Sequence, residues 1–218
     1  MLNHYAPAIW NAMIVTIQLT IISIICGTLL GIFVGVISSL NSPVRYLARI
    51  HIEIFLGLPV LVILVWFYYV LPIFDNRLAF EPFWTAVLAF SLSVSGFVAE
   101  IIESGFKSIP SGQVEAALML GLTRYQAIRH IILPQAITVM WSALIVQYIT
   151  TYKLVPLASI IGVNEILHVG GSIIQETYQP IEVYTLIAVL YLVTVYPLNI
   201  MARRLRKRFN SRGLLTGI

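Results

Sequence analysis

Charged residues are scarce in this chain. Only 10% of its 218 residues are Asp, Glu, Lys or Arg, whereas 59% are hydrophobic and the mean hydropathy is +0.93. A water-soluble domain carries roughly 25% charged residues, and a single soluble core could not bury so much apolar surface. The composition therefore excludes an ordinary soluble protein and makes the lipid bilayer the expected solvent.

Other absences exclude several kinds of function. A single cysteine, Cys26, cannot form a disulfide within the chain, and no GxxxxGK(S/T) phosphate-binding loop is present, so ATP hydrolysis is not expected here. No histidine lies in a cluster with ligand spacing, which argues against a metal site, a bound cofactor or a membrane enzyme with catalytic residues; the four are His4, His51, His130 and His168. Nothing indicates a nucleic-acid partner.

Long uncharged stretches predict an all-α integral membrane protein with about five transmembrane helices. About 20 apolar residues cross a bilayer, and the candidate segments are about 10–38, 54–74, 83–104, 134–153 and 183–202. The first has no basic residue before it and no clear cleavage site, so we expect it to be retained and not to be a signal peptide. Residues 1–218 are interpreted as one transmembrane domain.

The distribution of Lys and Arg predicts the orientation. If the N-terminus is outside, the inner segments 39–53, 105–133 and 203–218 hold eleven of the thirteen basic residues. This asymmetry favours an external N-terminus and a cytoplasmic C-terminus. Residues 154–163 are apolar but too short to cross the membrane, so 154–182 is expected to be a re-entrant or interfacial segment on the outer side. The basic run 203–208 is expected to anchor the topology, with an anionic-lipid site as the alternative.

Small residues recur on one face of the first predicted helix. Gly27, Gly31 and Gly35 are four residues apart, a spacing that lets another helix approach closely. The partner helix could belong to this chain or to another subunit.

The segment VEAALMLGLTRYQAIRHIILP, residues 114–134, is a polar interruption between the third and fourth apolar segments. We expect two short helices of about ten residues, with Ser111 capping the first and Gly121 in the left-handed conformation at its end. Thr123 and Gln126 match a capping box for the second. Helices this short must pack on something, either on their own bundle or on a cytoplasmic partner.

Residues 112–136 resemble the EAA loop of ABC-importer permeases, a pattern of Glu-Ala-Ala followed by a glycine and by Ile-x-Leu-Pro. Glu115, Ala116, Ala117, Gly121, Ile131, Leu133 and Pro134 stand at the matching positions. The preceding IPSGQ and AEIIESGFKS are similar to the polar amino-acid branch of that family, and Lys153, Leu157 and the segments 161–163 and 165–166 echo a later part of its pattern.

The resemblance implies a type I ABC-importer permease of the bacterial cytoplasmic membrane. In that family two permeases form the pathway, a cytoplasmic ATPase dimer uses ATP, and a periplasmic or surface-tethered binding protein delivers the substrate. The loop at 109–133 would be the coupling element, which implies contacts with the ATPase from Glu115, Ala116, Ala117, Leu120, Gly121 and Tyr125.

Polar residues within the apolar segments are candidates for the substrate pathway. Glu100 is the sharpest, because a carboxylate at membrane depth usually faces a cavity or a partner; it could equally be a helix–helix pair or an interfacial group. The other candidates are Ser93, Ser95, Gln147, Thr150, Thr151 and Lys153. The hydroxyls could instead bond their own helices, and Lys153 could extend toward the interface.

Three departures from the family pattern concern polar positions. Leu56 replaces an arginine, Glu103 replaces another, and Leu154, Val155 and Pro156 replace acidic and hydroxyl residues. One hypothesis, favoured over a homodimer of this chain, is a non-identical second permease that carries more of the ligand contacts. The rival function is a secondary transporter or channel that needs no ATPase. Many secondary transporters contain an inverted repeat, and because we find none in this sequence, the sequence argues against this rival.

Overall fold

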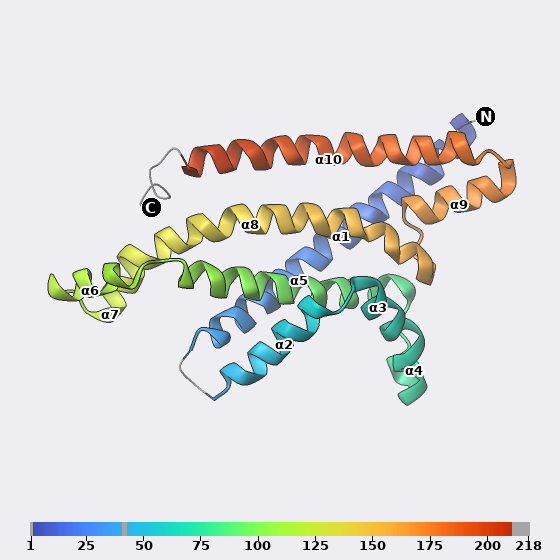
Figure 1. The fold of residues 1–218 in the computed structure, drawn as a ribbon. Helices are drawn as coiled ribbons and strands as arrows, with labels where there is room; N and C mark the ends of the chain where they lie inside the picture. The colour runs from blue at the N-terminus through green and yellow to red at the C-terminus, as the bar shows by residue number, and fades with distance from the viewer. Residues whose placement is uncertain (1, 41–42, 211–218) are drawn as a thin grey trace.

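Helix α5 (Pro82–Lys107) is the centre of the computed structural model, which describes residues 2–40 and 43–210 (Figure 1). It packs against α1 (Leu2–Ser38), α2 (Arg45–Gly57) and α8 (Leu133–Leu154). Pro82 begins α5 at a position where its missing N–H costs no hydrogen bond. The part of the chain that the structure describes is helical and contains no β-strand, as an all-α membrane protein requires.

The small residues of α1 lie directly against α5. A Cβ atom added to Gly27 would lie 2.6 Å from the Cβ of Val94, and one added to Gly31 would lie 2.6 Å from the Cβ of Val98. Since real Cβ atoms do not approach so closely, only glycine permits this helix pair. The glycine stripe therefore serves packing within the chain, which is one of the two alternatives predicted for it.

The second apolar segment is broken. Helix α2 ends at Gly57, Leu58 is extended, and a new helical stretch begins at Val60, with a bend of 103° between the two parts. That stretch consists of α3 (Val60–Val65), the π-helical turn η1 (Trp66–Val70) and α4 (Leu71–Phe74), followed by the short turn η2 (Asn76–Leu78). The break lies near the start of the predicted span 54–74, because Pro59 forces the residue before it out of the helical conformation.

The fourth apolar segment is part of a much longer helix. Helical backbone continues from α7 (Arg124–Ala127) through the π-helical turn η3 (Ile128–Ile132) into α8 and the 3-10 turn η4 (Val155–Ile161). The predicted span, about 134–153, lies within this helix, and Pro134 lies in the first turn of α8. The π-helical turn lies just before the proline, where the ordinary hydrogen-bond ladder cannot continue unchanged.

The C-terminal part returns along the bundle. After Gly162, which has a left-handed φ of 84°, come α9 (Ile166–Thr177) and α10 (Pro180–Asn210). Helix α9 packs against α1 and α10. Helices α1, α5 and α10 all extend beyond the segments predicted for them, because helical structure continues past the apolar core into the polar ends.

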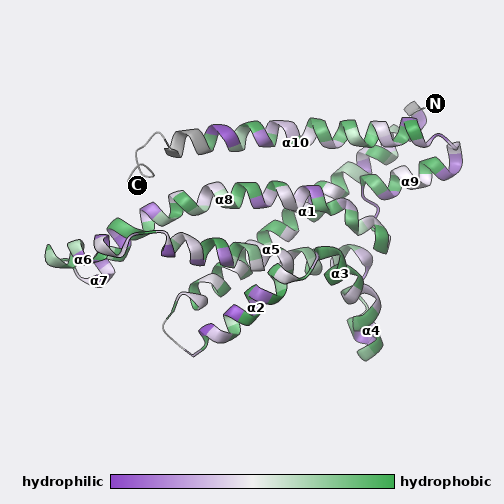
Figure 2. Cartoon of the chain, in the orientation of Figure 1, coloured by the Kyte–Doolittle hydropathy of each residue, from purple (hydrophilic) through white to green (hydrophobic). Residues whose placement is uncertain are grey.

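Within the described residues, four helices are long and apolar enough to cross a membrane, or five if the bent pair is one span. The ends of α1 and α5, the start of α2, α6 (Ser111–Met119) and the C-terminal part of α10 lie at one end of the bundle, and the start of α1 and α9 lie at the other (Figure 1). Figure 2 shows mainly hydrophobic residues in the half of α10 that begins at Pro180 and hydrophilic residues toward its other end. The predicted inner segments, as far as they are described, thus meet at one end; the side that this end faces stays a prediction.

Candidate coupling surface and transport pathway

The polar loop between α5 and α8 contains the predicted turn. Gly121 has a φ of +83°, and the N–H of Leu122 donates to the carbonyl of Ala117 at 3.1 Å, which closes α6. The left-handed glycine is confirmed. The capping role predicted for Ser111 is wrong: Pro110 occupies the cap position, and Ser111 is already the first helical residue.

The capping box of the second helix is confirmed. The backbone N–H of Gln126 donates to the hydroxyl of Thr123 at 3.3 Å, and the N–H of Thr123 donates to the Gln126 side chain at 2.8 Å. This helix is not the separate element of about ten residues that we predicted, because α7 continues without a break into α8. A displacement of the loop would therefore act directly on a transmembrane helix.

Apolar side chains are exposed at the tip of this loop. The side chains of Met119, Leu120 and Tyr125 are 88%, 82% and 68% exposed, and Glu115 and Ala116 are exposed beside them. Ala117, in contrast, is buried within the chain. Five of the six residues predicted to contact an ATPase are thus accessible to a partner, whereas the methyl group of Ala117 is turned toward its own loop.

A side-chain hydrogen bond holds α6 to the transmembrane helix. Gln135 of α8 donates its amide N–H to the side-chain oxygen of Gln113 at 2.6 Å and also to the carbonyl of Ile131 at 3.0 Å. The sequence contained no signal for this pair, because the residues are 22 positions apart. It fixes the start of α6 relative to α8.

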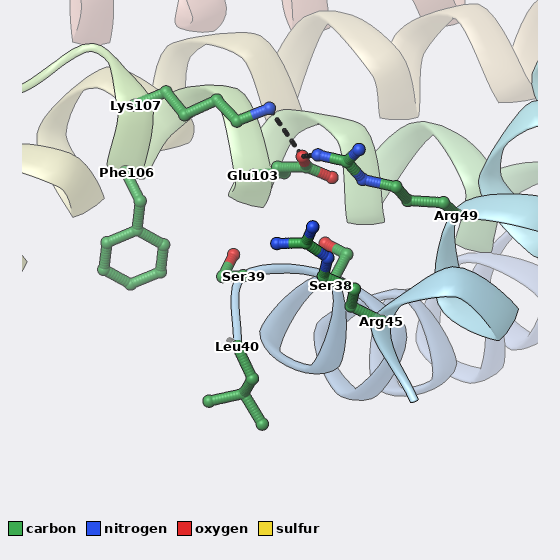
Figure 3. A pocket seen from close by; sticks show the side chains of 8 residues that line it. All are labelled: Ser38, Ser39, Leu40, Arg45, Arg49, Glu103, Phe106 and Lys107. Atoms are coloured by element: carbon green, nitrogen blue, oxygen red, sulfur yellow. Dashed lines mark hydrogen bonds and ion pairs between the residues drawn. The ribbon is translucent and has the colours of Figure 1, made fainter. Parts of the chain in front are cut away.

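A buried carboxylate links α5 to α2 just before the loop. Oε1 of Glu103 accepts from Nζ of Lys107 at 2.6 Å and from Nη2 of Arg49 at 3.3 Å (Figure 3). The Glu103 side chain is 8% exposed, compared with 65% for Lys107 and 44% for Arg49. No other ion pair occurs among the side chains of residues 4–40 and 43–205. The four-residue spacing of Glu103 and Lys107 was a usable sequence signal; the contact with Arg49 was not.

Glu100 lies in a different environment. It is exposed, and with Arg49, Glu53 and Glu103 it lines a hollow of about 200 Å³. The helix–helix ion pair that we considered for Glu100 is instead formed by Glu103, three residues further along α5. Sequence reasoning noticed Glu103 only as a departure from a family pattern.

The predicted pathway residues fall into separate groups. Ser93 and Ser95 are buried on α5, and Oγ of Ser95 lies 2.8 Å from Nε2 of His51 on α2 while donating to the carbonyl of Leu92. Thr150 and Thr151 donate to carbonyls one turn back in α8, those of Val146 and Gln147. Gln147 is half-buried and Lys153 is exposed. The two threonines therefore satisfy their own helix.

A second buried carboxylate lies at the other end of the bundle. Glu165 is fully buried, and its oxygens accept from the backbone N–H of His168 at 2.7 Å and from the hydroxyl of Tyr191 at 3.1 Å. Burial raises the pKa of Glu165, although the N–H groups of Leu167 and His168 act in the opposite direction. The N–H of Ile166 donates to Oγ1 of Thr16, so this region joins α9 to both α10 and α1.

Comparison with known proteins identifies the family to which this chain belongs. The profile of the family described as binding-protein-dependent transport system inner membrane component matches residues 27–212. This chain belongs to that family. It is therefore a multi-pass membrane permease.

Two relatives match most of the permease. The glutamine transport system permease protein GlnP of Escherichia coli K12 is 31% identical over 194 residues, which are 88% of this chain and 89% of the relative. The L-cystine transport system permease protein TcyL of Bacillus subtilis 168 is 32% identical over 197 residues, which are 88% of this chain and 82% of the relative.

Solved structures show the same fold. The permease resembles the crystal structure of an amino acid ABC transporter with histidines, with a TM-score of 0.88, 30% identity and coverage of 95% of this chain and 96% of that one. An inward-facing structure of the MetNI methionine ABC transporter has a TM-score of 0.78 at 20% identity and supports the fold alone. No group of three or more potential metal-ligating side chains gathers within the described part of the permease.

Proposed function

We propose that this permease is the membrane-spanning subunit of an ATP-driven ABC importer for polar amino acids. The names of the relatives support this substrate class, since they include glutamine and cystine permeases. The structural observation that carries the proposal is the exposed apolar tip of the loop, formed by Met119, Leu120 and Tyr125. Exposed large apolar side chains at the polar end of a membrane bundle are typical of a protein contact.

The partner at this tip is a cytoplasmic ATPase dimer, which binds and hydrolyses the ATP. Two features suit the loop to receive a mechanical signal. The α7–η3–α8 helix is continuous, and the bond between Gln113 and Gln135 ties α6 to it. ATP-driven closure of the ATPases would therefore move α8 together with the loop.

The pathway is formed with a second permease in a bacterial cytoplasmic membrane, and a periplasmic or surface-tethered binding protein delivers the substrate from the side of the N-terminus. A non-identical second permease is favoured, because Leu56 and Glu103 stand where the resembled pattern has arginines. Purification of the intact assembly followed by intact-mass analysis tests this directly. Two copies of this chain with no second permease would contradict the heteromeric pore.

Reconstitution in liposomes tests the main proposal. The permease and its co-purifying subunits are reconstituted with binding protein, and uptake of labelled glutamine is measured with ATP, without ATP and with a non-hydrolysable analogue. We expect uptake only with ATP, and we expect Leu120→Asp to reduce both uptake and ATPase retention because it places a charge in an apolar contact. Tyr178→Asp is the matched control for ATPase retention, since Tyr178 is 86% exposed on the α9–α10 connection at the opposite end of the bundle. Uptake by the permease without ATPase would favour a secondary transporter or channel.

A further inference from the structure

A polar pocket opens where α1, α2 and α5 meet, at the end of the bundle that carries the loop. Its volume is about 270 Å³, and Figure 3 shows the side chains that line it: Ser38, Ser39, Leu40, Arg45, Arg49, Glu103, Phe106 and Lys107. None of these residues belongs to the exposed tip at which the ATPase is proposed to bind. The pocket is thus a separate feature of the permease.

The charges around the pocket are predominantly positive. Three cations, Arg45, Arg49 and Lys107, face one carboxylate, Glu103. Glu103 is already engaged by Arg49 and Lys107. Arg45 forms no ion pair with any described residue, and its guanidinium points into the pocket beside the hydroxyls of Ser38 and Ser39 (Figure 3). A half-buried guanidinium in this setting favours an anion that can accept two of its hydrogen bonds.

The other negative charges near the pocket lie on the side away from Arg45. Glu53 and Glu100 line the neighbouring hollow, which shares Arg49, Glu103 and Lys107 with the pocket but does not include Arg45. The C-terminal ends of α1 and α5 also disfavour an anion, whereas the start of α2 favours one. The full charges of Arg45 and Lys107 outweigh these partial charges, so the position for an anion is the Arg45 side of the pocket.

The apolar part of the lining narrows the ligand class. Leu40 and Phe106 lie beside the cations, and the pocket lies where the uncharged run of α1 ends and the first charged residue, Arg45, follows. On α2, Leu47 and Ile50 are 69% and 54% exposed, as expected for a surface that contacts lipid. A ligand that suits both the cations and the apolar side chains carries a phosphate and an acyl-glycerol group.

We infer that this pocket binds the phosphate headgroup of an anionic phospholipid. Arg45 would hold the phosphate with Lys107, and Leu40 and Phe106 would contact the glycerol and the beginning of the acyl chains. Basic pockets between transmembrane helices are known to hold such headgroups. Bound lipid would bridge α1, α2 and α5 next to the start of the loop. This inference does not depend on the proposed function.

Native mass spectrometry of the full chain with its co-purifying subunits tests the inference. Retention of phosphatidylglycerol is titrated against phosphatidylcholine for the wild type, Arg45→Gln, Arg45→Lys and Arg124→Gln. Arg124 is exposed on α7 and outside the pocket, so Arg124→Gln removes the same charge elsewhere. We expect Arg45→Gln to weaken phosphatidylglycerol binding roughly tenfold, because a charge-assisted bond is lost, Arg45→Lys to weaken it less, and Arg124→Gln to leave it within about twofold, as for a change outside the contact.

Three results would overturn the inference. They are equal retention by wild type and Arg45→Gln, equal losses in Arg45→Gln and Arg124→Gln, and binding of soluble glycerol phosphate as tight as that of phosphatidylglycerol. The second result would indicate general surface charge, and the third a soluble phosphate ester as the ligand. Size-exclusion profiles and circular dichroism in phosphatidylcholine show whether Arg45→Gln is folded, and Arg45→Lys gives a second reading of the same contact.

Discussion

Lys107 donates to Glu103 across one turn of α5 at 2.6 Å, and Arg49 reaches the same carboxylate oxygen from α2 at 3.3 Å. Helix α6 begins at Ser111, only four residues after Lys107. The point at which the loop leaves the bundle is therefore held by two helices, α5 and α2. The bond between Gln113 and Gln135 attaches it to a third, α8.

Replacing Glu103 by Gln should loosen this attachment. Arg49 and Lys107 are substantially exposed, so water replaces part of their lost interaction with the carboxylate. We therefore expect the free energy of unfolding to fall by roughly 1 kcal/mol. Thermal unfolding in detergent measures it, and a double-mutant cycle with Arg49→Gln isolates the pair. The control is Glu100→Gln, which removes an exposed carboxylate three residues away. An equal loss in the control would contradict a specific role for Glu103.

Gly121→Ala should destabilise the turn between α6 and α7. No atom obstructs a Cβ at Gly121, but its φ of +83° is strained for alanine, and a left-handed alanine costs about 1–2 kcal/mol. We expect lower uptake together with ATP hydrolysis that is no longer coupled to transport. Gly112→Ala is the matched control, because Gly112 also has open space around it but has no positive φ. If both variants behaved alike, the conformation of Gly121 would not be the cause.

Gly31→Ala should disrupt the contact between α1 and α5. The new Cβ would lie 2.6 Å from the Cβ of Val98 and 2.8 Å from the carbonyl oxygen of Ser95, which is backbone and cannot move alone. Overpacking of this kind costs about 1–3 kcal/mol. Thermal unfolding should show it, whereas Gly171→Ala, with no atom near its added Cβ, should change stability little. An unchanged midpoint for Gly31→Ala would rule out the tight packing.

Glu165 should make the stability of the permease depend on pH. Its pKa is raised above the ordinary 4.5 by burial, so the folded state binds the proton more tightly than the unfolded state. The stabilisation is present below the ordinary pKa and is lost as the pH rises through the raised value. The difference in unfolding midpoint between wild type and Glu165→Gln, measured across this range, reports the effect.

Two substitutions of Glu165 distinguish the effect of its charge from the effect of its hydrogen bonds. Glu165→Gln keeps an oxygen for the N–H of His168 and should be tolerated, whereas Glu165→Ala leaves that N–H and the Tyr191 hydroxyl without their partner. Unsatisfied buried groups cost about 1–3 kcal/mol each. A flat pH profile for the difference between wild type and Glu165→Gln would contradict the raised pKa.

Local features of the fold were predictable from the sequence. A left-handed glycine and a capping box depend on residues within one turn of each other, so Gly121 and the pair Thr123 and Gln126 could be assigned from spacing alone. The apolar segments followed from composition, because each must satisfy its own backbone in lipid. The likeness to importer permeases rested on the same short stretch of sequence.

Two prolines show where local reasoning failed. Pro59 lies within a break of 103°, while Pro134 lies within a continuous helix after a π-helical turn. Both residues lack an N–H and favour a helix start. The surrounding packing decides whether the chain bends or the helix widens, and that packing involves residues far away in the sequence.

The sequence by itself determined that this chain is an all-α membrane protein with a polar, turn-containing loop, since hydropathy and turn chemistry act over a few residues; the resemblance of that loop to the EAA pattern indicated an importer permease. Only the tertiary structure decided that Glu103, and not Glu100, meets Arg49, that Gln113 meets Gln135, and that Arg45 faces a pocket. The two glutamates are less than one turn apart on α5. Which of them faces α2 depends on the rotation of α5, and close packing of α5 against α1, α2 and α8 sets that rotation.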